Sequence, residues 1–297
     1  MSKISLSKLS KQDILFVINP NSGTDRKKSS LENSIKSHLS AEKSNAIIVY
    51  TKRPLHAQEI VQSYLKKGIK EVVAVGGDGT INEVASQLIG TDVVLNLISK
   101  GSGNGLARHL GVFENEKSCV ERINQGKVID IDTGLINGIP FLCTAGLGFD
   151  AYGAEKFGKM EGRGFKNYVR ASLSSYFQYK PLQIQLDGTS HKVFSITFGN
   201  ASQYGNNAFI TPTASVTDGL LDCCIIKEHP KTAGLGLTQK LFSGKIETSK
   251  YVEYYRRKSF VIKLQEPALI HYDGEPMQLE SKEIKVEIKP KSLKIKI

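Results

Sequence analysis

No stretch of the sequence holds the roughly 18 uninterrupted apolar residues that a membrane-spanning helix needs, and runs such as Ile14–Ile18 have the length of a buried strand. Only four of the 297 residues are cysteine, and none of them forms a Cys-x-x-Cys pair. We therefore expect buried thiols rather than a zinc site or a disulfide framework. Residues 1–13 are polar and lack the apolar core of a secretory signal, which favours a cytoplasmic location.

Positive charge is what the chain has in excess. The 40 Lys+Arg outnumber the 29 Asp+Glu and give a net charge of +11, which suits an anionic nucleotide, nucleic acid or membrane surface. Residues 1–131 carry +5 (18 basic, 13 acidic) and residues 132–297 carry +6 (22 basic, 16 acidic), so the excess marks no single region. Because no nucleic-acid-binding module is legible, we expect no nucleic-acid partner.

Strand-like and helix-like patterns alternate along the first 130 residues. Short apolar runs predict strands at Ile14–Ile18, Ala46–Thr51, Glu71–Val75 and Val93–Ile98. Apolar residues three or four positions apart predict helices between them, over residues 31–39, 57–65 and 81–89. The alternation predicts an α/β domain that has a parallel sheet with helices on both faces.

The pattern changes near residue 130, where no flexible linker marks a boundary. Most later segments alternate apolar and polar residues, as Glu283–Ile288 does, and are separated by Gly, Asn, Asp and Pro turns. This pattern predicts an antiparallel β domain with one solvated face. A helix-like stretch over Phe165–Phe177 interrupts it.

Three glycine-rich loops, at Asn19–Gly23, Gly76–Thr80 and Gly101–Asn104, each follow an apolar strand. Ligands of a doubly wound sheet bind at the carboxyl ends of its strands, so we expect these loops to share one rim. Glycine lets backbone N–H groups approach phosphate oxygens closely, which predicts a phosphate-binding rim. None of the loops fits the Walker or the dinucleotide-binding pattern.

Acidic residues accompany two of the candidate loops. Asp78 lies among the glycines of the second loop and is either the N-cap of a helix starting at Thr80 or a Mg²⁺-binding or catalytic carboxylate. The tripeptide Asp273–Glu275 is either an ordinary hairpin turn or part of the same site. Phosphoryl transfer needs phosphate donors, Mg²⁺ ligands and a base, and these carboxylates offer the last two.

Together these motifs resemble the diacylglycerol kinase catalytic family, lipid kinases that are related to sphingosine and ceramide kinases. The matching segments, in the family's order, are Asn19–Gly23, Thr51 with His56 and Ala57, Gly76–Glu83, Gly101–Asn104, Gly146–Asp150, Thr217–Asp222 and Asp273–Glu275. The Gly76–Thr80 motif alone is shared with NAD kinases and phosphofructokinases. The ordered set covers nearly the whole chain and is far more specific.

The resemblance implies a fold and a reaction. The fold is an α/β nucleotide-binding domain of the NAD kinase and phosphofructokinase type over residues 1–131, followed by an antiparallel β-sandwich over residues 132–289. Residues 290–297 are expected to return to the first domain. The reaction is transfer of the γ-phosphoryl group of ATP, with Mg²⁺, to a lipid hydroxyl. Diacylglycerol is the favoured acceptor, and a sphingoid base or another lipid alcohol is possible.

The resemblance also implies roles for individual residues. The ATP-binding set is Asn19, Pro20, Asn21, Ser22, Gly23, Thr51, Gly76, Gly77, Asp78, Gly79, Thr80, Ile81, Asn82, Gly101, Ser102, Gly103 and Asn104. Asp273 would be the general base, with Asp78 as the alternative, and Asp78 and Glu275 would hold the catalytic Mg²⁺ directly or through water. A structural Mg²⁺ would lie on Asp218 and the carbonyls of Ser215 and Leu220, where a plain β-turn is the alternative.

Two departures from the family leave the acceptor lipid open. Gly105 stands where many bacterial members have Asp, and Tyr152 stands where sphingosine kinases have an acid, although Asp150 is close. Two other functions are weighed against a lipid kinase. One is a kinase of the NAD kinase type that acts on a soluble substrate, and the other is a catalytically inactive lipid-binding regulator. A homodimer is possible.

Residues 156–180 mix basic and aromatic side chains. This mixture predicts an interfacial patch or a lid over a lipid cleft, and the alternative is a core-packed helix with a solvated basic face. A second basic site, Arg256–Lys258, is expected to be solvated charge. The charge of residues 156–180 favours peripheral contact with the anionic inner surface of the membrane.

Overall fold

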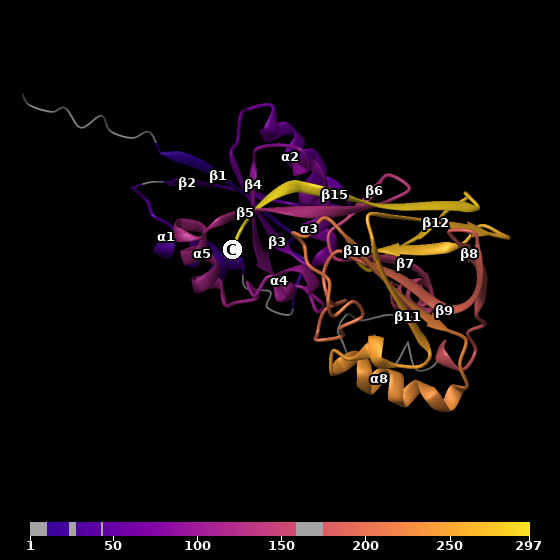
Figure 1. Cartoon of the computed structure of the whole chain (residues 1–297). Helices are drawn as coiled ribbons and strands as arrows, with labels where there is room; N and C mark the ends of the chain where they lie inside the picture. The colour runs from indigo at the N-terminus through magenta and orange to yellow at the C-terminus, as the bar shows by residue number, and fades with distance from the viewer. Residues whose placement is uncertain (1–10, 24–27, 43, 159–174) are drawn as a thin grey trace, which may run out of the picture.

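The computed structural model describes residues 11–23, 28–42, 44–158 and 175–297, which form an α/β half and a β half (Figure 1). Four parallel strands make the sheet of the first half, in the order β4-β3-β1-β2. They are β1 (Gln12–Ile18), β2 (Ser44–Tyr50), β3 (Glu71–Gly76) and β4 (Val94–Ser99). The helices of this half are α1 (Lys28–His38), α2 (His56–Leu65), α3 (Asp78–Leu88), α4 (Gly105–His109) and α5 (Glu116–Gln125).

Side chains of the central strands alternate between the two faces of this sheet. Ile14 and Phe16 of β1 pack in a core with α1 and α5, whereas Leu15 and Val17 pack in a core with α2 and α3. A strand that is buried on both faces needs a continuous apolar run, which is what the sequence shows. The predicted α/β half with three layers is confirmed.

The second half is built mainly from antiparallel strands. They are β5 (Val128–Ile136), β6 (Ile139–Phe141), β7 (Thr144–Gly148), β8 (Leu182–Leu186), β9 (Thr189–Gly199), β10 (Leu221–Lys227), β11 (Val252–Arg257), β12 (Ser259–Leu264), β13 (Leu269–Tyr272), β14 (Glu275–Gln278) and β15 (Glu283–Lys296). The helices α6 (Phe149–Gly158) and α8 (Gly234–Phe242) and the short 3₁₀ helices η1 (Lys231–Ala233) and η2 (Ile246–Thr248) join them.

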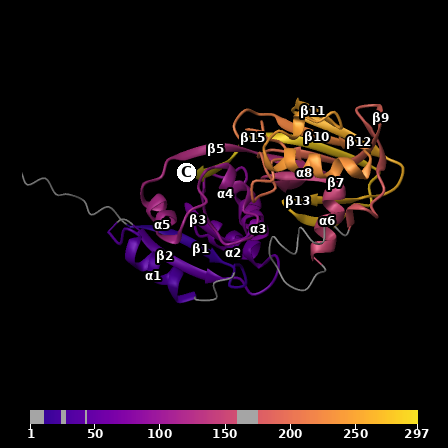
Figure 2. The same ribbon diagram turned by 90° about the horizontal axis from the view of Figure 1, so that it is seen from below.

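Strand β9 connects the two layers of this half. Its first residues pair with β8, and its last residues pair with β7 and β10. Inward-facing residues of both layers, including Phe198 and Phe260, form one core. The predicted antiparallel β-sandwich is confirmed, and Figure 2 shows it beside the α/β half.

A long two-stranded ribbon, β5 with β15, runs through both halves (Figure 1). The first part of β15 pairs with β12, and near its end Lys294 and Ile295 pair in parallel with Val94 and Leu95 of β4. The hydrogen-bonded sheet therefore continues from one half into the other. The domain limits at residues 131 and 289 stay predictions, because β5 and β15 cross them.

Two further expectations concern burial and helices. Cys119, Cys143, Cys223 and Cys224 are all buried and free, as predicted. The helix expected over Phe165–Phe177 lies mostly outside the described residues. No helix in the described ranges combines the length and the apolar character needed to span a membrane.

Asp132 fixes the ribbon where it passes between the halves. This residue of β5 is buried, and its carboxylate accepts hydrogen bonds from the backbone N–H groups of Gly219 and Lys291, both at 2.7 Å. Lys291 lies at the bulge of β15 and has a φ of 47°. One carboxylate thus holds three segments together that are far apart in the sequence.

We expect Asp132→Ala to lower the free energy of unfolding by about 2–3 kcal/mol, because two backbone N–H groups that point at a buried carboxylate lose their acceptor. Asp130→Ala is the matched control on the same strand. Asp130 makes only a surface ion pair with Lys294, at 3.2 Å, and its loss should cost under about 1 kcal/mol. Urea unfolding measures both variants, and equal effects would contradict the role of Asp132.

Candidate functional site

The three glycine-rich loops meet at the carboxyl ends of β1, β3 and β4. The backbone N–H of Asn19 donates to Val75 at 2.9 Å, and the N–H of Lys100 donates to Gly76 at 2.7 Å. The side chain of Asn19 donates to the hydroxyl of Thr80 at 3.0 Å, which ties the first loop to the second. The second and third loops approach so closely that a Cβ on Gly101 would lie 2.7 Å from the Cα of Gly77. Glycine is required for this contact.

Asp78 is the first residue of α3, and it does not cap the helix. The N-cap is Gly77, so the alternative in which Asp78 caps a helix at Thr80 is wrong. The Asp78 carboxylate instead accepts hydrogen bonds from the backbone N–H groups of Asn104, at 2.8 Å, and Gly105, at 3.0 Å. This carboxylate therefore sets the shape of the third loop.

The surroundings of Asp78 favour its protonated form. Burial raises its pKa from 3.8 to about 6, and the negative charge of Asp273 adds to the rise. The hydrogen bonds from Asn104 and Gly105 oppose the shift, but burial outweighs them. A carboxyl group that changes charge close to neutral pH is suited to handling a proton or binding a cation.

Asp273 lies in the turn between β13 and β14 and has a φ of 47°. Its carboxylate accepts hydrogen bonds from the side chain of Asn82, at 2.8 Å, and from the backbone N–H groups of Leu142, Cys143 and Thr144, at 2.8, 2.7 and 3.2 Å. Burial raises the pKa of Asp273, and these hydrogen bonds lower it. Because Asn82 belongs to α3, the turn is fixed against the α/β half.

Glu275 comes from the same turn and reaches the second loop. A Cβ on Gly79 would lie only 2.7 Å from a carboxylate oxygen of Glu275, so the backbone of Gly79 and this side chain are in contact. The structure thus brings Asp78, Asp273 and Glu275 to the start of α3.

The carboxylates at the start of α3 suit a metal ion whose remaining ligands are phosphate and water. In the described part of the chain, no group of three or more His, Cys, Asp and Glu side chains is placed to hold a metal ion on its own. Mg²⁺ commonly binds through one or two carboxylates, with phosphate and water completing its shell. Asp78 and Glu275 offer hard oxygen donors of that kind.

Glu83, the last residue of the Gly76–Glu83 motif, contacts the start of α2. Its carboxylate accepts hydrogen bonds from the N–H groups of Leu55, at 3.0 Å, and Ala57, at 3.2 Å. These groups begin α2, so Glu83 braces the loop that follows Thr51. The N–H of Thr51 donates to Ile18 at 2.8 Å, which places Thr51 beside the first loop.

A segment that the sequence analysis missed, residues 202–209, covers the third loop from the β half. Gly205 forms an isolated bridge with Asn104, and the N–H of Asn206 donates to Gly103 at 3.3 Å. A Cβ on Gly205 would lie 2.4 Å from the carbonyl oxygen of Gly103. The only signal in the sequence is a cluster of Gly and Asn residues between two strands.

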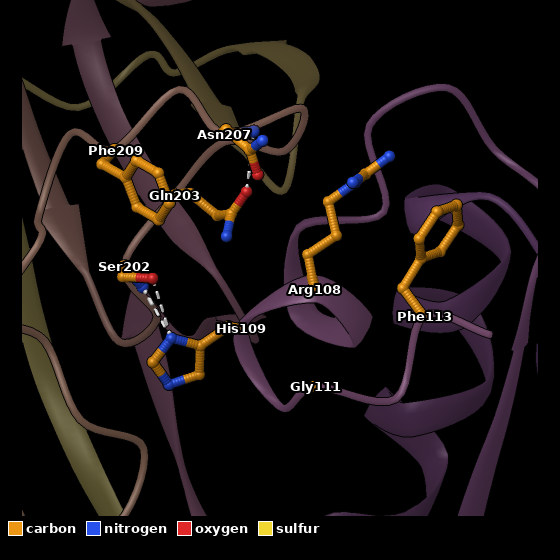
Figure 3. A pocket seen from close by; sticks show the side chains of 8 residues that line it. All are labelled: Arg108, His109, Gly111, Phe113, Ser202, Gln203, Asn207 and Phe209. Carbon is orange, nitrogen blue, oxygen red and sulfur yellow. Dashed lines mark hydrogen bonds between the residues drawn. The ribbon is translucent and has the colours of Figure 1, made fainter. Parts of the chain in front are cut away.

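A pocket of about 370 Å³ lies between this segment and α4 (Figure 3). Arg108 lines it, donates to the carbonyl of Gly103 at 3.1 Å and stacks over the ring of Phe113. His109 Nδ1 accepts from the N–H of Ser202 at 3.1 Å, and burial lowers the pKa of this histidine. These contacts fix the far side of the third loop.

Two other acidic residues are already engaged. Asp150 accepts hydrogen bonds from the hydroxyls of Thr197 and Tyr204, both at 2.5 Å. Asp218 accepts from the N–H of Leu220 at 3.0 Å and forms an ion pair with Arg256. The structural Mg²⁺ on Asp218, Ser215 and Leu220 stays a prediction, and any cation there would compete with the Arg256 guanidinium.

The structure describes the basic segment Arg256–Lys258 but little of residues 156–180. Most of residues 156–180 lies outside the described residues. In the second segment, Arg256 pairs with Asp218 and Asp222, and Arg257 pairs with Asp187. These ion pairs neutralise much of the charge of Arg256–Lys258.

We expect Asp78 to make folding less favourable as pH rises. Its carboxyl ionises near pH 3.8 in the unfolded chain and near pH 6 in the folded protein, so the folded state binds the proton more tightly. That contribution is complete below the unfolded pKa and is lost as pH rises through the folded pKa. Asp78→Asn should therefore gain up to about 3 kcal/mol of unfolding free energy relative to the wild type between about pH 4 and pH 7.

Urea unfolding at several pH values measures this difference. Asp92→Asn is the control, because Asp92 forms only a surface ion pair with Lys294, at 3.8 Å. If Asp78→Asn has the same pH slope as the wild type, Asp78 is not the group that titrates.

Comparisons with known proteins identify the domains of the chain. Residues 13–136 match the diacylglycerol kinase catalytic domain, and residues 144–297 match the YegS C-terminal NAD kinase beta sandwich-like domain. A diacylglycerol kinase of Mycobacterium tuberculosis (strain ATCC 25618 / H37Rv) is 33 % identical over 200 residues, or 63 % of this chain and 65 % of that protein. The chain thus matches just under two thirds of that relative's length.

More distant relatives cover more of the chain. Sphingosine kinase 1 of Arabidopsis thaliana is 25 % identical over 342 residues, or 93 % of this chain and 70 % of that protein. The crystal structure of a diacylglycerol kinase from Bacillus anthracis strain Sterne superposes with a TM-score of 0.72 at 20 % identity and covers 97 % of both chains. The structural likeness supports the fold. Since the two domain models together account for most of the sequence, the chain belongs to the diacylglycerol kinase catalytic family, with a C-terminal domain of the YegS type.

Proposed function

We propose that the protein is a lipid kinase that transfers the γ-phosphoryl group of ATP to a lipid hydroxyl and depends on Mg²⁺. One observation carries the proposal. The carboxylates of Asp78 and of the Asp273–Glu275 turn lie together at the rim formed by three glycine-rich loops. Phosphoryl transfer needs this combination of phosphate-binding backbone, metal ligands and a base. Diacylglycerol is the favoured acceptor, because the Mycobacterium tuberculosis relative is named for it.

The nucleotide would lie along the rim. Asn19–Gly23, Thr51, Gly76–Asn82 and Gly101–Asn104 are the proposed ATP-binding residues. Close contacts such as that between Gly77 and Gly101 leave no room for a Cβ, which supports a cradle that approaches phosphates through its backbone. The start of α3 adds the positive end of a helix dipole.

Mg²⁺ would be held by Asp78 and Glu275, directly or through water, and would neutralise charge on the transferring phosphate when bound. The carboxylate oxygens of these residues suit this metal. The proximity of Asp273, whose charge raises the pKa of Asp78, makes the site favourable for a cation.

Either Asp273 or Asp78 would accept the proton of the lipid hydroxyl. A carboxylate offers about four lone-pair sites, and Asp273 already accepts four hydrogen bonds. Asp78 accepts from two backbone groups and has a pKa of about 6, closer to neutral pH. The geometry therefore favours Asp78 as the base, with Mg²⁺ held by Glu275 and reached by Asp78 only through water, and Asp273 as a fixed charge that positions Asn82.

The acyl chains need an apolar site close to the β half. A groove of about 390 Å³ runs along the edge of this half, beside α6 and β13. Its apolar and aromatic lining includes Tyr152, Tyr179, Pro181, Leu182, Ala268 and Leu269. We propose that the groove holds part of the lipid and that the protein works at the inner membrane surface from the cytoplasm.

We expect purified protein with Mg²⁺ and γ-³²P-ATP to label a lipid presented in mixed micelles. The screen compares diacylglycerol, monoacylglycerol, phosphatidylglycerol and sphingosine, with NAD as the water-soluble acceptor. Labelling of NAD alone would support a kinase of the NAD kinase type. No labelling of any acceptor, together with retained lipid binding, would support an inactive regulator.

We expect Asp78→Asn to lower kcat by about 10²-fold or more, because it removes the base. In the wild type, kcat/KM should rise with pH through about 6, since Asp78 must lose its proton to act. Asp273→Asn should lower activity and keep this limb but shift it to lower pH, because the charge of Asp273 that raises the pKa of Asp78 is gone. If Asp273→Asn abolishes the pH limb and Asp78→Asn keeps it, Asp273 is the base. Glu121→Gln, at an exposed surface ion pair with Lys117 on α5, is the control.

A further inference from the structure

Large apolar side chains gather on the outer side of α8. Seven large hydrophobic residues are exposed in the described part of the chain, and three of them, Phe177, Leu235 and Phe242, belong to this surface. Leu235, at 81 %, and Phe177, at 68 %, are the two most exposed of the seven. Single exposed apolar residues are ordinary, but a cluster of them indicates a surface that contacts another protein or a membrane.

These residues lie on the exposed side of α8 because its opposite side packs against the β half. Leu237 and Leu241 of α8 pack with Cys224 and Tyr254 of the β half. Leu235 and Phe242 are seven positions apart, so they share one stripe of the helix, which faces away from that core. In Figures 1 and 2, α8 lies on the outside of the β half.

Phe177 joins the same surface through its neighbour. The hydroxyl of Tyr176 would lie 2.5 Å from a Cβ on Gly234, the first residue of α8, and it donates to the carbonyl of Lys231 at 3.2 Å. The rings of Tyr176 and Phe177 are in edge contact, with centroids 5.5 Å apart. We call Phe177, Leu235 and Phe242, with Lys231, Lys240 and Lys245, the α8 surface.

The charge of the α8 surface has one sign. No Asp or Glu occurs between Glu228 and Glu247, whereas three lysines do. Glu228 is paired with Lys192 at 2.8 Å. Apolar side chains that project from a basic rim match an anionic bilayer, where acyl chains lie beneath negative head groups.

The α8 surface also adjoins the apolar groove. The Nζ of Lys231 donates to the carbonyl of Tyr179 at 3.3 Å, and the ring of Tyr179 lines the groove with Tyr152 and Leu182. A bilayer on this surface would therefore lie beside the groove. That placement matters for a lipid acceptor, which has to leave the bilayer to be phosphorylated.

We propose that the α8 surface docks the protein on an anionic bilayer and presents the groove to membrane lipid. Its use in catalysis rests on the proposed function, but the docking itself does not. A second copy of the chain is a poorer occupant, because a symmetric dimer would place each patch against its own copy and bring like charges together. A bilayer with anionic head groups offers the opposite charge.

Vesicle sedimentation without ATP tests the docking. Wild-type protein is mixed with phosphatidylcholine vesicles, with or without phosphatidylglycerol, and should partition onto the anionic ones. The double variant Leu235→Ser/Phe242→Ser should lower this partition by about tenfold or more, since two apolar side chains no longer enter the bilayer. Lys245→Glu should lower it by about fivefold or more and weaken its salt dependence.

Matched controls lie on the α/β half. Val128→Ser removes an exposed apolar side chain at the start of β5 and Lys66→Glu reverses an exposed charge after α2, and neither should change the partition. Urea unfolding should give a single cooperative transition for all variants, which shows that they fold whether or not the protein has kinase activity.

Three outcomes would overturn the docking proposal. The α8 variants could partition like the wild type, the controls could lose partition equally, or sedimentation velocity could show that the α8 variants only dissociate a dimer. If the α8 variants alone lose partition while no lipid is phosphorylated by any form, the docking surface stands and the proposed function fails.

Discussion

The hydrogen bonds around the Asp273 carboxylate are the interaction on which the site depends. They join a turn of the β half to Asn82 of α3 and to the backbone of residues 142–144. Because the turn is fixed there, Glu275 is carried to the backbone of Gly79. These bonds are what hold the carboxylates of the β half at the rim of the α/β half.

The third glycine-rich loop is held from two sides, and this explains the environment of Asp78. Residues 202–209 cover the loop from the β half, while Asp78 accepts its N–H groups from the other side. Burial of this carboxyl outweighs both hydrogen bonds in setting its pKa. The protein therefore pays in stability for a carboxyl group close to a second one, an arrangement that a cation or a proton would relieve.

The sequence predicted the parts of the fold that depend on local pattern. Apolar runs gave the strands, and a loop after a parallel strand must lie at its carboxyl end, so the rim followed from Asn19–Gly23, Gly76–Thr80 and Gly101–Asn104. The ordered motifs placed Asp273 and Glu275 with Asp78. Side-chain partners were not predictable, because they depend on tertiary packing. Neither the contact of Glu83 with Leu55 and Ala57 nor the covering by residues 202–209 has a periodic signal.

The effective charge of a surface likewise cannot be predicted from the local sequence alone. The basic run Arg256–Lys258 lies on β11 and its end, where the neighbouring strand and turns bring Asp187, Asp218 and Asp222 to its arginines. The α8 region has a sparser set of lysines, but no acid is interspersed among them. An anionic partner is attracted by the charge that is left after ion pairing. Exposed apolar area beside that charge strengthens the contact. By that measure the positive charge at α8 matters more than that of Arg256–Lys258, although the latter is denser in sequence.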